Sequence, residues 1–76
     1  MKVKMYVFEE EDKIVYFWPD ERFVTTSLDK SMMYDGLYDS GCGNEEQFSS
    51  ADSVKEIDIS EVPSIATLAK LKMTHQ

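Results

Sequence analysis

The feature that most constrains the fold is an unbroken apolar run, IVYFW at residues 14–18, in a chain of only 76 residues. β-Branched and aromatic residues favour strands, and a strand with one wet face alternates apolar and polar side chains. This run is apolar on both sides, so the strand that it predicts needs cover on both faces of its sheet. Cover is scarce, because a chain this short buries only about 60% of the surface that its unfolded form exposes.

Segments with strand character flank this run. Val3, Met5 and Val7 alternate with other side chains, which predicts a strand over residues 3–8. The acidic segment 9–13 predicts a turn, and Pro19 predicts another, because proline suits the second position of a type I turn. Residues 22–28 predict a third strand. We therefore expect a three-stranded antiparallel meander.

The second half of the chain predicts one later strand and a helix. Residues 54–59 read as a fourth strand, although their apolar spacing is imperfect. Ser60 or Ser64 can cap a terminal helix that has Pro63 in its first turn and an apolar stripe along one side. The expected fold is a single α+β domain over residues 1–76: a small antiparallel sheet, made of the meander plus the later strand, with the C-terminal helix packed on one face.

The middle of the chain holds all three glycines and the only cysteine, within residues 33–46. Asp29 can cap a short helix before this segment. Asn44, followed three residues later by Gln47, resembles a capping box that opens one helical turn over residues 45–48. Since glycine accepts left-handed backbone conformations, residues 36–43 predict a mobile acidic loop.

This loop lacks the partners that chemistry would need. A nucleophilic cysteine requires a base, but the acids around Cys42 disfavour its thiolate and the only histidine is His75. One cysteine and one histidine cannot supply the four ligands of a zinc site. A calcium-loop register beginning at Asp35 lacks an oxygen ligand at its third position and glycine at its sixth. We predict no catalytic residue, no metal site and no cofactor.

Charge is distributed unevenly. The chain has 15 acidic and 8 basic residues, a net charge of −7, and all its acids lie between residues 9 and 61. Nonspecific binding to nucleic acid depends on cations that neutralise phosphates, so we expect no direct contact with nucleic acid. An acidic surface is instead attracted to a basic protein surface, or it mimics DNA.

The amino-terminal residues contain no continuous apolar stretch. A signal peptide needs an apolar region and a membrane span needs about 20 apolar residues. A single unpaired thiol fits a reducing compartment. We therefore expect no membrane association and a location in the cytoplasm, or in the host cytoplasm if the chain is phage-encoded.

The apolar excess of the meander leads to a hypothesis about function. One terminal helix covers one face of the sheet, and a large uncovered apolar surface marks an interaction site. We predict a non-enzymatic, homodimeric protein-binding module that inhibits or regulates a larger protein, for example a phage-encoded antagonist of a host enzyme or defence system. The expected interface residues are Tyr6, Phe8, Tyr16, Trp18, Phe23, Tyr34 and Tyr38.

Three alternatives remain open from the sequence. The meander can curl into a closed monomeric core, because small sheets coil strongly. The chain can act as an acidic DNA mimic that blocks a nucleic-acid-binding protein. The least supported alternative is a small metal-binding protein or enzyme.

Overall fold

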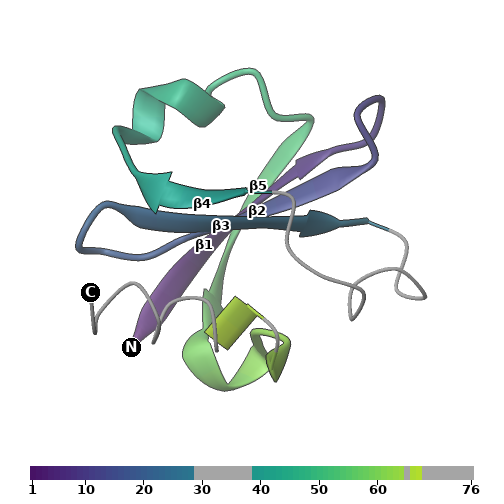
Figure 1. Cartoon of the computed structure of the whole chain (residues 1–76). Helices are drawn as coiled ribbons and strands as arrows, with labels where there is room; N and C mark the ends of the chain where they lie inside the picture. The colour runs from purple at the N-terminus through teal and green to yellow at the C-terminus, as the bar shows by residue number, and fades with distance from the viewer. Residues whose placement is uncertain (29–38, 65, 68–76) are drawn as a thin grey trace.

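The computed structural model describes residues 1–28, 39–64, 66 and 67, and these residues form one antiparallel sheet (Figure 1). The strands, in the spatial order β4-β3-β2-β1-β5, are β1 (Lys2–Phe8), β2 (Lys13–Phe17), β3 (Arg22–Ser27), β4 (Asp39–Cys42) and β5 (Ser53–Asp58). Two 3-10 turns accompany them, η2 (Glu45–Phe48) and η3 (Ile59–Glu61). The described fold is therefore mostly β.

The predicted meander is confirmed. β1 pairs with β2 and β2 pairs with β3, both in antiparallel register. The turn predicted at Pro19 is present, since Glu21 N donates to Trp18 O at 3.1 Å. The two connections end on residues in the left-handed region, Asp12 (φ 54°) and Glu21 (φ 67°). A left-handed residue at this place is common in hairpin loops, where it matches the twist of the strands.

The segment predicted as a glycine-rich loop contains a strand, so that prediction is wrong for residues 39–42. β4 pairs with β3, and Gly41 lies opposite Phe23. A Cβ atom at Gly41 would make an ordinary van der Waals contact with the Phe23 ring at 3.6 Å, whereas one at Gly43 would overlap the Gln47 side chain. Neither glycine adopts a left-handed φ, so Gly43 permits a close approach of Gln47 and neither glycine forms a left-handed turn. The earlier part of the predicted loop, with Gly36, lies outside the described residues.

The later strand is confirmed as β5, which pairs with β1 and forms one edge of the sheet. The helical turn predicted at residues 45–48 is confirmed as η2, but its capping box is not. Asn44 makes no side-chain hydrogen bond to the turn. A real capping box lies at η3 instead: Asp58 accepts from Ser60 N at 3.0 Å, and Glu61 accepts from Asp58 N at 3.0 Å.

The predicted C-terminal helix is not confirmed. The element after β5 is the 3-10 turn η3, which contains Ser60 and is capped by Asp58. Beyond it, Pro63 O accepts hydrogen bonds from the backbone N–H groups of residues 66 and 67. The rest of that predicted helix lies outside the described residues, as does the short helix predicted after Asp29. No helix in the described part of the chain is long and apolar enough to cross a membrane.

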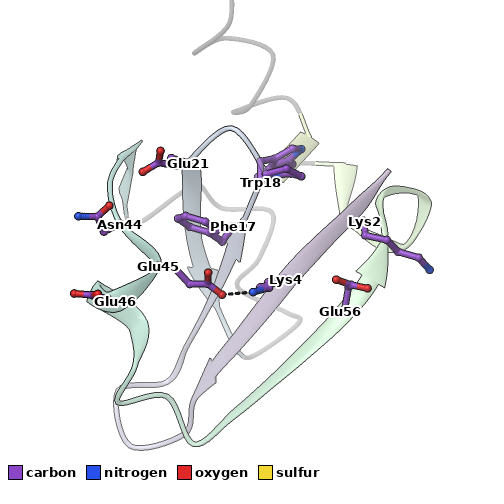
Figure 2. Close-up of a pocket in the computed structure, with 10 residues that line it drawn as sticks. Lys2, Lys4, Phe17, Trp18, Glu21, Asn44, Glu45, Glu46 and Glu56 are labelled. Carbon is purple, nitrogen blue, oxygen red and sulfur yellow. Dashed lines mark hydrogen bonds and ion pairs between the residues drawn. The ribbon is translucent and has the colours of Figure 1, made fainter.

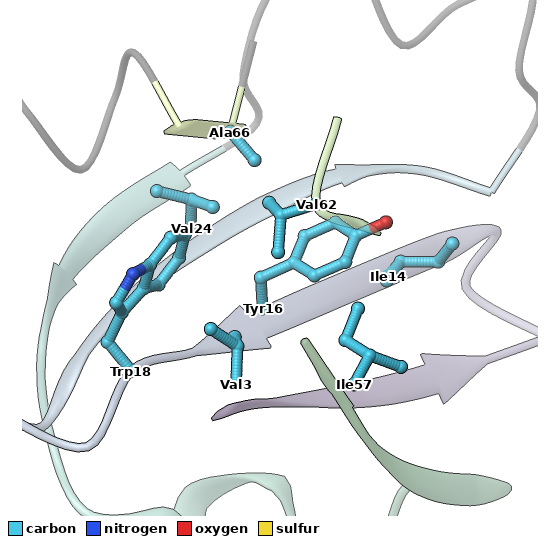
Figure 3. Close-up of a cluster of buried hydrophobic side chains, with 8 residues drawn as sticks. All are labelled: Val3, Ile14, Tyr16, Trp18, Val24, Ile57, Val62 and Ala66. Carbon is cyan, nitrogen blue, oxygen red and sulfur yellow. The ribbon is translucent and has the colours of Figure 1, made fainter. Parts of the chain in front are cut away.

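Both faces of the sheet are covered by short elements, with η2 on one side and η3 on the other (Figure 1). The η2-side cluster consists of Tyr6, Phe8, Val15, Phe17, Phe23 and Phe48. The η3-side cluster consists of Val3, Ile14, Tyr16, Trp18, Val24, Ile57, Val62 and Ala66 (Figure 3). Successive residues of β2 enter alternate clusters, because neighbouring side chains of a strand point to opposite faces. The apolar run at residues 14–18 is thus buried on both sides.

Candidate functional site

The five predicted interface residues that the structure describes are buried within the chain itself. Their exposed fractions are 5% for Tyr6, 7% for Phe8, 3% for Tyr16, 1% for Trp18 and 8% for Phe23. Three of them belong to the η2-side cluster and two to the η3-side cluster, on opposite faces of the sheet. The structure therefore does not bring them together as one surface. The other two, Tyr34 and Tyr38, lie outside the described residues.

The premise that this chain cannot cover its own sheet is therefore wrong, and on the η2 side Phe48 contributes to the cover. Its ring centroid lies 5.4 Å from that of Tyr6, 5.7 Å from that of Phe17 and 5.2 Å from that of Phe23. Phe48, on the single turn η2, thus covers aromatic rings on the sheet face for which the predicted terminal helix provided no cover. Contact between these five rings and a partner stays a prediction. Because the rings are buried, the surface that a partner can reach is formed by other residues.

A polar contact holds η2 against β1. Tyr6 Oη donates to Glu45 Oε1 at 2.6 Å, and Lys4 Nζ donates to the same oxygen. The Lys4 hydrogen bond, followed by that of Tyr6, holds the pKa of Glu45 below its ordinary value. Burial, and then the hydrogen bond to Glu45, raises the pKa of the Tyr6 hydroxyl above its ordinary value. At neutral pH the carboxylate is charged and the phenol keeps its proton, so this contact fastens the turn.

A cleft of about 630 Å³ opens beside this contact (Figure 2). Its lining comes from β1, from the end of β2 with the turn that follows it, from the start of η2 and from β5: Lys2, Lys4, Phe17, Trp18, Pro19, Glu21, Asn44, Glu45, Glu46 and Glu56. A second hollow of about 670 Å³ shares Lys4, Glu45, Glu46 and Glu56 with it and extends along β5 to Val54. We term the two together the acidic cleft.

Carboxylates outnumber cations in this cleft. The lining of the first hollow includes four glutamates and two lysines, and Lys4 already contacts Glu45. Figure 2 shows Glu45 and Glu46 on one side and Glu56 on the other, with Lys4 between Glu45 and Glu56 and with Phe17 beside Glu45. Like charges around a shared hollow produce a negative potential that attracts cationic groups. The arrangement thus offers apolar surface flanked by acceptors for basic side chains.

These groups do not amount to a metal centre. Within residues 1–28, 39–64, 66 and 67, no three His, Cys, Asp or Glu side chains come close enough to hold a metal ion. Cys42 is exposed on β4, and the only histidine, His75, lies outside the described part.

The sequence did not reveal the cleft, because its walls come from segments far apart in the chain. The one available signal was Phe48, the only aromatic residue after residue 38. An isolated aromatic residue beside a short polar turn indicates that the turn is anchored in an apolar surface. Once η2 is anchored, its two glutamates must lie near β1 and β5. Comparison with known proteins found no matching family model, no matching curated protein and no matching solved structure.

Proposed function

We propose that this chain is a non-enzymatic protein-binding module that binds a basic segment of a larger protein in the acidic cleft and so inhibits or regulates that protein. The observation that supports the proposal is the lining of the cleft, in which four glutamates accompany two lysines, the exposed Pro19 and the largely buried Phe17. We place this activity in the cytoplasm, or in the host cytoplasm if the chain is phage-encoded.

Two physical effects favour a basic protein segment as the ligand. Arginine and lysine bury long apolar stems while their charged heads stay near water or an acceptor, which suits a cleft whose lining includes Phe17, Pro19 and four glutamates. Complementary charge across an interface also speeds association and excludes acidic partners. The predicted homodimer was based on uncovered rings, and with those rings buried the proposal concerns a different protein as partner.

Charge reversal inside and outside the cleft tests the proposal. The cleft variant is Glu46→Lys with Glu56→Lys, two exposed glutamates of the lining. The matched control is Glu9→Lys with Glu10→Lys, two exposed residues of the β1–β2 turn. Each tagged protein is used to capture partners from the native cell, and quantitative mass spectrometry compares them. We expect the wild type and the turn variant to retain one common protein, and the cleft variant to lose at least about tenfold of it, since buried interface charges of the wrong sign cost several kcal/mol.

Two outcomes would count against this proposal. Equal retention by the cleft variant would show that the partner binds elsewhere. Equal loss from both variants, with release of the partner by duplex DNA, would favour the DNA mimic, because a mimic distributes its carboxylates over the whole surface in place of phosphates.

A further inference from the structure

Among the residues that the structure describes, β5 forms an open edge of the sheet. It lies at the end of the strand order, and residues 53–56 are exposed. Val54 is 58% exposed, although it is a large apolar residue. Edge strands with free backbone groups accept added strands from other chains. The opposite edge, β4, has four residues and includes Gly41, which makes it a weaker template.

The register shows which backbone groups face outward. Ile59 N donates to Met1 O at 2.9 Å, and the same alternation pairs Ile57 with Val3 and Lys55 with Met5. The odd-numbered residues of β5 therefore direct their backbone groups toward β1. Val54 and Glu56 direct theirs away from the sheet.

The open stretch of this edge has a defined end. Asp58 N, the next outward group along β5, donates to Glu61 Oε2 at 3.0 Å. The capping box therefore closes the edge at Asp58. Val54 and Glu56 remain as the two residues whose outward backbone groups a further strand would meet.

The pairing of β1 with β5 indicates which side chains fit opposite β5 on the face that carries the cleft. Lys4 lies opposite Glu56 and Tyr6 lies opposite Val54, and both Glu56 and Val54 line the acidic cleft. Opposite charges, and an aromatic residue facing a β-branched one, are favourable cross-strand pairs. A strand added on the outer side of β5 meets the same two side chains, because directly opposed residues share a face of the sheet.

A second copy of this chain is a poor occupant of the edge. A two-fold axis at Lys55 sets that lysine opposite its own copy, and an axis at Glu56 does the same for the glutamate. An axis at Val54 sets Glu56 opposite Asp52. Each of these three registers thus opposes like charges, which destabilises pairing. The edge suits a strand of different sequence.

We propose that β5 accepts an extended segment of the partner protein as an antiparallel sixth strand, with a basic residue opposite Glu56, an acidic residue opposite Lys55 and an apolar residue opposite Val54. In the partner this reads basic, acidic, apolar from the amino to the carboxyl direction. The inference rests on the proposed function, because the basic side chain enters the acidic cleft, and it adds the backbone pairing that holds the segment.

A synthetic peptide tests this mode of binding. The probe is Thr-Lys-Thr-Lys-Glu-Val-Thr with blocked ends, whose second lysine, glutamate and valine take the three positions above. Amide hydrogen exchange in the full chain is followed by NMR. With free peptide about tenfold above its Kd, exchange at Val54 and Glu56 should slow about tenfold. The amides of Lys55 and Ile57, which already face β1, should change little.

N-methylated peptides provide matched controls that leave the protein unchanged. Methyl groups on the amides of the second lysine and the valine, which face β5, should abolish the protection. The amides of the middle threonine and of the glutamate, on either side of the second lysine, face away from β5. Methyl groups on these two amides should preserve the protection. Equal binding by both methylated peptides, or no protection by millimolar probe, would overturn strand addition.

The outcomes also separate this inference from the proposed function. If the cleft variant loses the captured protein while the peptide gives no protection at Val54 and Glu56, binding in the cleft stands and strand addition falls. If those two amides become protected without peptide as the protein concentration rises, β5 pairs with its own copy, and the inference is wrong.

Discussion

At the scale of single residues, Glu45 links the covering turn to the sheet, and its charge state should control that link. Its pKa is lowered in the folded chain by Lys4 and Tyr6, against an ordinary value of about 4.3 when unfolded. A lowered folded pKa means that the ionised carboxylate stabilises the fold fully above the unfolded value. This stabilisation is lost as the pH falls through the lower folded value.

Replacement of this residue checks the sign of the effect. We expect Glu45→Gln to lower the free energy of unfolding at pH 7, and the difference from the wild type to shrink below about pH 4 as the wild-type carboxyl becomes protonated. Urea unfolding followed by the fluorescence of the buried Trp18 provides the measurement. The neighbouring exposed Glu46→Gln controls for loss of charge. A deficit in Glu45→Gln that persists unchanged at pH 3 would contradict this role.

At the scale of elements, the η2 turn depends on one aromatic ring. Phe48 contacts the rings of Tyr6, Phe17 and Phe23, and truncation of a buried phenylalanine costs about 3–5 kcal/mol. A chain of this size has a total stability of about 4–11 kcal/mol. We expect Phe48→Ala to remove much of that stability in urea unfolding.

Two further variants calibrate this prediction. Phe48→Leu, which keeps most of the apolar volume, should cost clearly less than the alanine variant. Ser49→Ala, at an exposed position in the same segment, should change the stability by less than about 0.5 kcal/mol. A cost below about 1 kcal/mol for Phe48→Ala would show that another part of the chain covers this face.

Most of the strands could be predicted from the sequence, whereas one strand and the capping residue could not. β1, β2, β3 and β5 followed from runs of β-branched, aromatic and alternating residues. β4 did not, because the residues DSGC have no apolar period and extend only through pairing with β3. The capping prediction favoured Asn44, but only the geometry shows that Asp58 makes the reciprocal hydrogen bonds.

At the scale of the whole molecule, the cover on each face depended on long-range contacts that no local pattern shows. Periodicity identified the apolar run at residues 14–18 as needing cover on both sides, and the two clusters confirm this. Periodicity could not show that Phe48 returns across β1, β2 and β3. For the same reason, periodicity predicted the aromatic rings as the binding surface, although they are buried. It gave no indication of the cleft between η2 and β5.

Site-specific photo-crosslinking in the native cell tests most directly the claim that this chain acts by binding a protein in the acidic cleft. A photoreactive side chain is placed at Val54 or Glu46 in the cleft, or at Glu10 in the β1–β2 turn, all of them exposed positions. We expect one common crosslinked protein from the two cleft positions and none of it from the turn. Crosslinks to that protein from Glu10 alone would show that it binds outside the acidic cleft.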